Sequence, residues 1–308
     1  MNELVATIQS VLNDADLVLG WTRNEKTGVA EPARFYTAAD AGAAVFDSTC
    51  VHNLAVYLPR LKDRTAGIVA KGCDARAIVQ LIVEREVERE RVRIIGVPCP
   101  GMLDVKKLWR GVGFGCKLTD AEGRVTVEQT TIPREDVLLA KCRGCRDLVP
   151  VLYDEAAGDL DNPKVPPPAE PAELEQRFAA MTPAQRREFW EEQFSRCIRC
   201  YACREACPMC FCRDVCTMQT REPRWVSDEA VASQARMAQH IRVSHLAGRC
   251  TGCGECERAC PAGIPLMLML GEQNRAIEEM FGYRAGASME QKPPLLTFDI
   301  KTDTWEKQ

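Results

Sequence analysis

Apolar and polar positions in the first half of the chain predict a strand, a helix and a second strand. Residues 66–70 form a short apolar run that ends at Gly72, and residues 92–97 form a second run that ends at Pro98. Between these runs, residues 77–87 have apolar positions at helical spacing beside a stretch of charged side chains. Because a crossover of this length usually joins parallel neighbouring strands, we expect an α/β domain here.

The second half of the chain has helical patterns instead. Thr182 followed by Pro183 has the residue types of a helix start, an N-cap and a proline at the first helical position. A further helix is expected to begin at Ser227 or Asp228 and to end at Gly248. This part of the chain is therefore predicted to be mainly α-helical.

A proline-rich stretch separates the two patterns. Its five prolines lie between residues 163 and 171 and predict an extended, semi-rigid linker. We therefore divide the chain into an α/β domain (1–160), a linker (161–176), a mainly α-helical domain (177–285) and a C-terminal tail (286–308).

The composition excludes several classes of protein. The 308 residues have a formal net charge of -4, whereas a nucleic-acid partner requires a basic face. No run of about eighteen apolar residues is present, so we expect no membrane span. The N-terminus lacks a basic leader, so we expect a cytoplasmic protein whose 17 cysteines are reduced or bound to metal.

Eleven of the cysteines fall between residues 197 and 260, and eight of these form two copies of the pattern C-x-x-C-x-x-C-x-x-x-C-P. Three cysteines three apart on one loop can bind three corners of a [4Fe-4S] cluster. In two-cluster ferredoxins the cysteine before the proline binds the other cluster. The spacing therefore predicts Cys197, Cys200, Cys203 and Cys260 for cluster 1, and Cys250, Cys253, Cys256 and Cys207 for cluster 2.

Zinc is the alternative for these loops, but two C-x-x-C pairs suffice for a tetrahedral zinc site. Zinc leaves no reason for a third cysteine in register followed by C-P, twice. Three further cysteines, Cys210, Cys212 and Cys216, depart from the pattern and are not assigned. They would complete a third cluster, form a separate metal site, protect the first loop as unligated thiols, or be ordinary buried thiols.

The motif pair, with a helical segment between its copies and the ending CPAGIPL, resembles a known group of proteins. These are the α-helical ferredoxin domains of heterodisulfide reductase and of glycerol-3-phosphate and succinate dehydrogenase iron-sulfur subunits. The resemblance covers residues 180–275. It implies two [4Fe-4S] clusters and a role in electron transfer.

Four cysteines of the α/β domain form another candidate metal site. Cys142 and Cys145 are a C-x-x-C pair, and Cys73 and Cys99 follow the ends of the two predicted strands. Because parallel strands end at the same edge of a sheet, Cys73 and Cys99 are expected at one edge. Four thiolates suit either an iron-sulfur cluster or zinc.

The sequences GCDARAI, IIGVPCPGM and KCRGCRD around these cysteines resemble the deazaflavin-dependent hydrogenase/dehydrogenase beta-subunit family over residues 65–160. The resemblance implies that Cys73, Cys99, Cys142 and Cys145 bind an iron-sulfur cluster next to FAD. FAD is therefore a candidate cofactor, although the chain has no G-x-G-x-x-G or P-loop motif of its own.

We therefore expect an iron-sulfur electron-transfer subunit of a soluble multi-subunit oxidoreductase, with redox proteins as partners and no catalytic residues of its own. Heterodisulfide reductase, hydrogenase and formate dehydrogenase systems are the candidate partner enzymes. In one alternative, the first domain binds FAD and splits a hydride from a deazaflavin or nicotinamide carrier into single electrons. In the other, zinc organises a scaffold protein without redox function.

Overall fold

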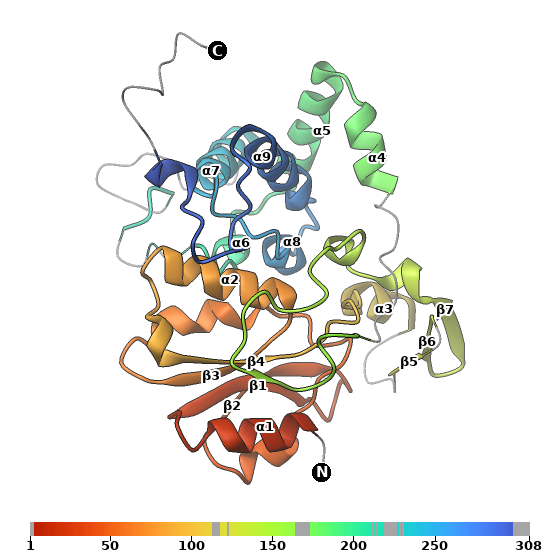
Figure 1. Cartoon of the computed structure of the whole chain (residues 1–308). Coiled ribbons are helices and arrows are strands. Elements are labelled where there is room, and N and C mark those ends of the chain that lie inside the picture. The colour runs from red at the N-terminus through yellow and green to blue at the C-terminus, as the bar shows by residue number, and fades with distance from the viewer. Residues whose placement is uncertain are drawn as a thin grey trace.

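The first half of the chain forms a mixed sheet of five strands (Figure 1). Neighbouring strands run parallel, except for β1 and β2, which are antiparallel. The computed structural model describes residues 3–112, 118–121, 123–163, 173–210, 212, 215–218, 227, 229 and 231–297. In spatial order the strands are β2 (Ala30–Phe35), β1 (Leu17–Arg23), β3 (Ala66–Ala70), β4 (Val92–Gly96) and β8 (Glu155–Ala156).

The predicted strand-helix-strand unit is present as β3, α2 (Gly72–Val83) and β4, with the two strands parallel. The helix bounds differ from the predicted 77–87, because α2 begins at Gly72 instead of following it. Lys71 and Asp74 explain the early start: the Asp74 carboxylate accepts a hydrogen bond from the Lys71 backbone N–H group at 3.3 Å and forms a buried ion pair with Lys71 Nζ at 2.8 Å. The helix also ends four residues before the predicted end.

Helices cover both faces of the sheet. Helix α1 (Glu3–Val11) lies on one face, and α2 lies on the other, toward the C-terminal helices (Figure 1). A separate antiparallel sheet packs with α3 (Val105–Val112) around a small core of its own. Its strands are β5 (Leu118–Ala121), β6 (Arg124–Val127) and β7 (Thr130–Pro133).

The second half is mainly helical, as predicted. Thr182 begins α5 with a capping box to Gln185. Helix α7 begins at Ala232, after a residue with extended backbone, and not at the predicted Ser227 or at Asp228, which lies outside the described residues. None of the described helices is long and apolar enough to cross a membrane. The helices are α4 (Glu173–Ala180), α5 (Pro183–Ser195), α6 (Ala202–Glu205), α7 (Ala232–His245), α8 (Glu255–Ala259) and α9 (Leu266–Phe281).

The two halves share one hydrophobic core. Ile68 and Ile94 of the sheet belong to the same cluster of buried side chains as Phe194 and Ile264 of the second half. Phe194 stacks on Trp190 with ring centroids 5.3 Å apart, and Trp190 packs against the same core. Burial of this apolar surface is the main force that holds the halves together.

Polar contacts also join the two halves along α2. Arg249 contacts both carboxylate oxygens of Glu84, with Nε–Oε1 and Nη2–Oε2 distances of 2.9 and 2.6 Å. Gln80 Oε1 accepts hydrogen bonds from the Tyr283 hydroxyl and the Gly286 amide, both at 2.9 Å. A β-carbon at Gly286 would lie 2.0 Å from a carbonyl oxygen of α2, so only glycine fits this close approach.

The predicted division into domains is only partly covered by the described residues. Residues 164–172 of the linker and 298–308 of the tail lie outside them. Helix α4 begins at Glu173, within the predicted linker. The division itself stays a prediction.

Candidate metal centres

The two cysteine-rich loops have the same backbone shape. In the first loop, Arg199 and Tyr201 have φ angles of 52° and 59°. In the second, Gly252 and Gly254 occupy the same positions relative to the first cysteine, with φ angles of 73° and 67°. The loops lead into α6 and α8, which lie against one another, as do the preceding helices α5 and α7. A repeated unit of helix, loop and short helix therefore presents each set of cysteines.

Arg199 and Tyr201 have a backbone conformation that is uncommon outside glycine, and both side chains are held in place. Arg199 is 8% exposed and donates hydrogen bonds to the Tyr201 hydroxyl at 2.7 Å and to the Glu229 carbonyl oxygen at 3.1 Å. The Tyr201 hydroxyl donates to the Met218 carbonyl oxygen at 3.2 Å. Contacts to the following segment therefore support the shape of the first loop.

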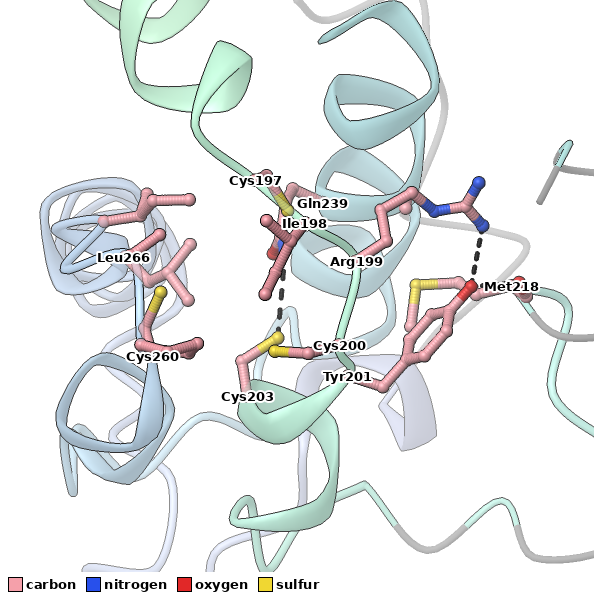
Figure 2. Close-up of a pocket in the computed structure, with 14 residues that line it drawn as sticks. Cys197, Ile198, Arg199, Cys200, Tyr201, Cys203, Met218, Gln239, Cys260 and Leu266 are labelled. Carbon is pink, nitrogen blue, oxygen red and sulfur yellow. Dashed lines mark hydrogen bonds between the residues drawn. The ribbon is translucent and has the colours of Figure 1, made fainter. Parts of the chain in front are cut away.

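The four cysteines predicted for cluster 1 line one cavity (Figure 2). Cys197, Cys200 and Cys203 come from the first loop and α6, and Cys260 follows α8. Gln239 of α7 donates its side-chain amide to the Cys203 sulfur at 3.7 Å (Figure 2). Four sulfurs around a largely apolar cavity fit a [4Fe-4S] cluster, and their role as ligands stays a prediction.

The four cysteines predicted for cluster 2 lie in the core. Cys250, Cys253, Cys256 and Cys207 are each 9% exposed or less. Burial raises the pKa of the Cys256 thiol to about 12, and the charge of Cys207 acts in the same direction on all three thiols of the second loop. Cys207 therefore lies close enough to the second loop to influence its thiols, and its role as a ligand of cluster 2 stays a prediction.

The three unassigned cysteines do not all lie together: Cys210 and Cys212 line one cavity with Cys207, whereas Cys216 packs in a separate cluster. A hydrogen bond between the Cys210 and Cys207 thiols lowers the pKa of Cys210 and raises that of Cys207. Cys212 is exposed, and Cys216 packs near Met218. In the described part of the chain, no three histidine, cysteine or acidic side chains form a site for a single metal ion. Because its thiol contacts that of Cys207, Cys210 lies beside a proposed ligand of cluster 2.

The four predicted cysteines of the first half also line one cavity, at the edge where β3 and β4 end. Cys73 lies in the first turn of α2 and Cys99 follows β4, while Cys142 ends a short 3-10 helix (Ala140–Cys142) and Cys145 lies on the loop after it. Backbone N–H groups donate to the sulfurs of Cys142 and Cys145 at 3.3 and 3.4 Å. By residue type, four thiolates suit an iron-sulfur cluster or zinc, although the described side chains are not placed around a single metal ion; the role of this site stays a prediction.

Several of these sulfurs accept a hydrogen bond from the backbone N–H group two residues further along the chain. Such bonds stabilise a thiolate, whereas burial raises the pKa of a thiol and favours the protonated form. A bound metal replaces the proton on the sulfur. Buried cysteines whose sulfurs accept hydrogen bonds from backbone N–H groups are therefore suited to bind a metal as thiolates. The sulfurs concerned are those of Cys99, Cys145, Cys207, Cys250 and Cys253.

A buried lysine that the sequence analysis did not single out lies between the first-half cavity and the second loop. Lys141 Nζ is 3.4 Å from Glu255 Oε1, and both side chains are 6% exposed or less. Burial by itself lowers the pKa of Lys141, but the negative charges of Cys73 and Glu255 raise it above its ordinary value. Thr251 and Gly252 of the second loop line the first-half cavity, so the two sites are neighbours.

His52 is a largely buried histidine among four charged side chains of this region. Burial is the largest cause that lowers the pKa of His52 to about 4; the charge of Arg258 follows, with smaller contributions from Lys71 and Lys141, and Glu255 opposes them. The His52 Nδ1 atom has no hydrogen-bond partner among the described residues. His52 is therefore neutral in the folded protein at neutral pH.

This lowered pKa predicts a loss of stability in acid. The unfolded state binds more protons than the folded state between pH 6.5 and about 4, so the unfolding free energy falls as the pH falls through this window. The contribution of one histidine is at most roughly 1.4 kcal/mol per pH unit. We expect His52→Gln to lose less stability across this window than the wild type, measured by anaerobic thermal unfolding. Parallel pH profiles of the two proteins would contradict the assignment.

Comparison with known proteins confirms the two-cluster character of the second half. Residues 192–264 match the family described as the 4Fe-4S dicluster domain. This match implies two [4Fe-4S] clusters and confirms the predicted fold class, an α/β region followed by a mainly helical dicluster region.

Two curated relatives match most of the chain. The chain is 24% identical over 300 residues to the F420-dependent formate dehydrogenase subunit beta of Methanocaldococcus jannaschii, with 78% of each chain covered. It is 23% identical over 299 residues to the F420-dependent formate dehydrogenase 1 subunit beta of Methanococcus maripaludis, with 76% of each chain covered.

A solved structure, of the F420-reducing [NiFe] hydrogenase complex from Methanosarcina barkeri, resembles part of the chain. The likeness covers 47% of this chain and 58% of that chain, at 14% identity and a TM-score of 0.36.

Proposed function

We propose that this chain is an electron-transfer subunit of a multi-subunit oxidoreductase. It is related to the beta subunits of the F420-dependent formate dehydrogenase and hydrogenase family, and it carries a C-terminal 4Fe-4S dicluster domain. Its partner is an enzyme of the formate dehydrogenase or hydrogenase type. The observation that carries the proposal is the repeated loop whose cysteines meet across the repeat.

The exchange of cysteines between the loops supports the proposed ligands. Cys260 shares a cavity with the first loop, and the charge of Cys207 acts on the thiols of the second. A bound [4Fe-4S] cluster supplies one-electron chemistry at each site. Backbone N–H groups and the Gln239 amide orient the sulfurs. The ligands are Cys197, Cys200, Cys203 and Cys260 at one site, and Cys250, Cys253, Cys256 and Cys207 at the other.

The cavity of the first half is proposed as a third cluster site, with Cys73, Cys99, Cys142 and Cys145 as ligands. Its position supports this choice, because residues of the second loop form part of its wall. A site so close to cluster 2 suits a continuous path for electrons between the halves. Zinc at this site is the alternative that the same four thiolates allow.

The proposal predicts the metal content of protein purified without oxygen. We expect about eight irons and eight sulfides per chain from the dicluster domain, and about twelve of each with a third cluster. About eight irons with one zinc would restrict the clusters to the second half. Zinc without acid-labile sulfide would contradict the electron-transfer function and favour the scaffold alternative.

A flavin-containing subunit is a second candidate, which the names of the two curated relatives favour. Both are described as F420-dependent, and residues 65–160 resemble a deazaflavin-dependent family. A flavin can accept a hydride and release single electrons, so FAD near the first-half cavity would couple a deazaflavin carrier to the clusters. Flavin absorbance in the same anaerobic sample tests this candidate, and its absence favours the simple relay.

A further inference from the structure

Arg242 is a buried arginine without an ordinary partner. It lies near the C-terminal end of α7 and is 2% exposed. No nitrogen or oxygen atom of the described residues accepts a hydrogen bond from its three side-chain nitrogens, and its contact is with the Cys256 sulfur. A guanidinium removed from water in this way is strongly destabilising unless negative charge lies close to it.

The charges around Arg242 are cysteine sulfurs of both proposed cluster sites. Cys203 belongs to the proposed ligands of cluster 1, while Cys256 and Cys207 belong to those of cluster 2, and Cys210 lies beside them. Burial lowers the pKa of Arg242, but these sulfurs in their thiolate form hold it well above its ordinary value, with Cys256 the largest contributor. The guanidinium therefore lies between the two sites.

Lys141 shows the ordinary way to bury a cation, because Glu255 is its ion-pair partner at 3.4 Å. For Arg242, the cysteine sulfurs around it are the groups that can balance its positive charge. Neutral thiols cannot balance a guanidinium, whereas thiolates bound to a cluster carry net negative charge. The site is therefore electrostatically complete only when clusters are bound.

We propose that Arg242 is a fixed positive charge shared by both clusters of the dicluster domain, and that it raises the reduction potentials of both. This inference rests on the proposed function. Reduction of a cluster adds one negative charge beside the guanidinium, so the cation favours the reduced form. It also weakens the repulsion between two reduced clusters, which eases the presence of two electrons at once.

The internal repeat supports a specific role for this residue. Arg242 lies eight residues before the first cysteine of its loop, and the corresponding residue of the first repeat is Phe189. The repeat therefore supplies one such cation and not two. A single guanidinium must lie between the two sites to act on both clusters. Two cations, one in each repeat, would each act on one cluster and would not need such a position.

The test compares Arg242→Gln, which removes the charge, with Arg242→Lys, which keeps it. The full chain is purified without oxygen, its iron and sulfide are measured, and both clusters are titrated by potential with paramagnetic resonance detection. For Arg242→Gln we expect the reduced-to-oxidised ratio of both clusters, at the wild-type midpoint, to fall about tenfold or more, a shift of about 59 mV. Arg242→Lys is expected to stay close to the wild type.

Arg236→Gln is the matched control on the same helix. The Arg236 side chain is 46% exposed and contacts Glu191 at 3.5 Å, so water and salt screen its charge. This control is expected to leave both potentials unchanged.

The outcomes distinguish a failure of the inference about Arg242 from a failure of the proposed electron-transfer function. The inference holds if Arg242→Gln lowers the potentials of both clusters and Arg242→Lys resembles the wild type. Loss of iron in Arg242→Gln with unchanged potentials of the clusters that remain would show a structural role and overturn the inference. It is also overturned if the Gln and Lys variants behave alike, whether both match the wild type or both lose iron. A wild-type chain that contains no clusters overturns the proposed function instead.

Discussion

Cys253→Ser is expected to remove one of the two clusters of the dicluster domain and to block electron transfer through it. Cys253 is buried, accepts a hydrogen bond from the Glu255 N–H group and lies in the proposed ligand set of cluster 2. A serine oxygen is a harder and more weakly bound ligand for this type of cluster than thiolate. Iron and sulfide should fall by about four each per chain.

The measurement combines iron analysis, paramagnetic resonance of the reduced protein and the rate of reduction of an artificial acceptor. The signal of cluster 1 should persist, which distinguishes loss of one site from unfolding of the domain. Cys212→Ser is the matched control, because Cys212 is exposed and outside both ligand sets. Full iron content and unchanged electron transfer in Cys253→Ser would show that cluster 2 does not use this residue.

Gly72→Ala is expected to disrupt the first-half cavity. A β-carbon at Gly72 would lie 2.1 Å from the Asp147 carbonyl oxygen and 2.9 Å from that of Val149. Both atoms belong to backbone and cannot turn aside, so the loop that carries Cys142 and Cys145 must move. We expect a loss of roughly 3 kcal/mol of unfolding free energy or more, since overpacking against backbone is costly.

The same variant should lose the metal of the first-half cavity and keep the iron of the dicluster domain. Thermal unfolding and metal analysis on one anaerobic sample measure both effects. Gly42→Ala is the control, because a β-carbon there meets no atom within 4 Å. Wild-type stability and metal content in Gly72→Ala would mean that the contact with Asp147 does not hold the cavity together.

Features that depend on neighbouring residues in the sequence could be predicted from it. The capping box at Thr182 is local, and so is the spacing of Cys197, Cys200 and Cys203 around one loop. The approach of Cys73 to Cys99 could also be predicted, because parallel strands end at one edge. Each of these features follows from a short stretch of sequence or from a simple rule of sheet topology.

Features that depend on contacts between distant segments could not be predicted. Gly72 suggested the end of a structured run, but Lys71 and Asp74 form a buried pair that begins α2 there. Arg242 sits in a helix whose sequence gives no hint of its surroundings, since the sulfurs near it come from two loops. Lys141 likewise meets Glu255 only because the halves pack together.

The repeated loop has a consequence for mutational tolerance. At Gly252 and Gly254 the left-handed backbone is available because no β-carbon is present, so almost any larger residue there is strained. At Arg199 and Tyr201 the same shape depends on side chains that reach other segments, and those segments must stay in place. The two halves of the repeat are alike in form, but they accept different substitutions and are therefore free to diverge in sequence along different routes.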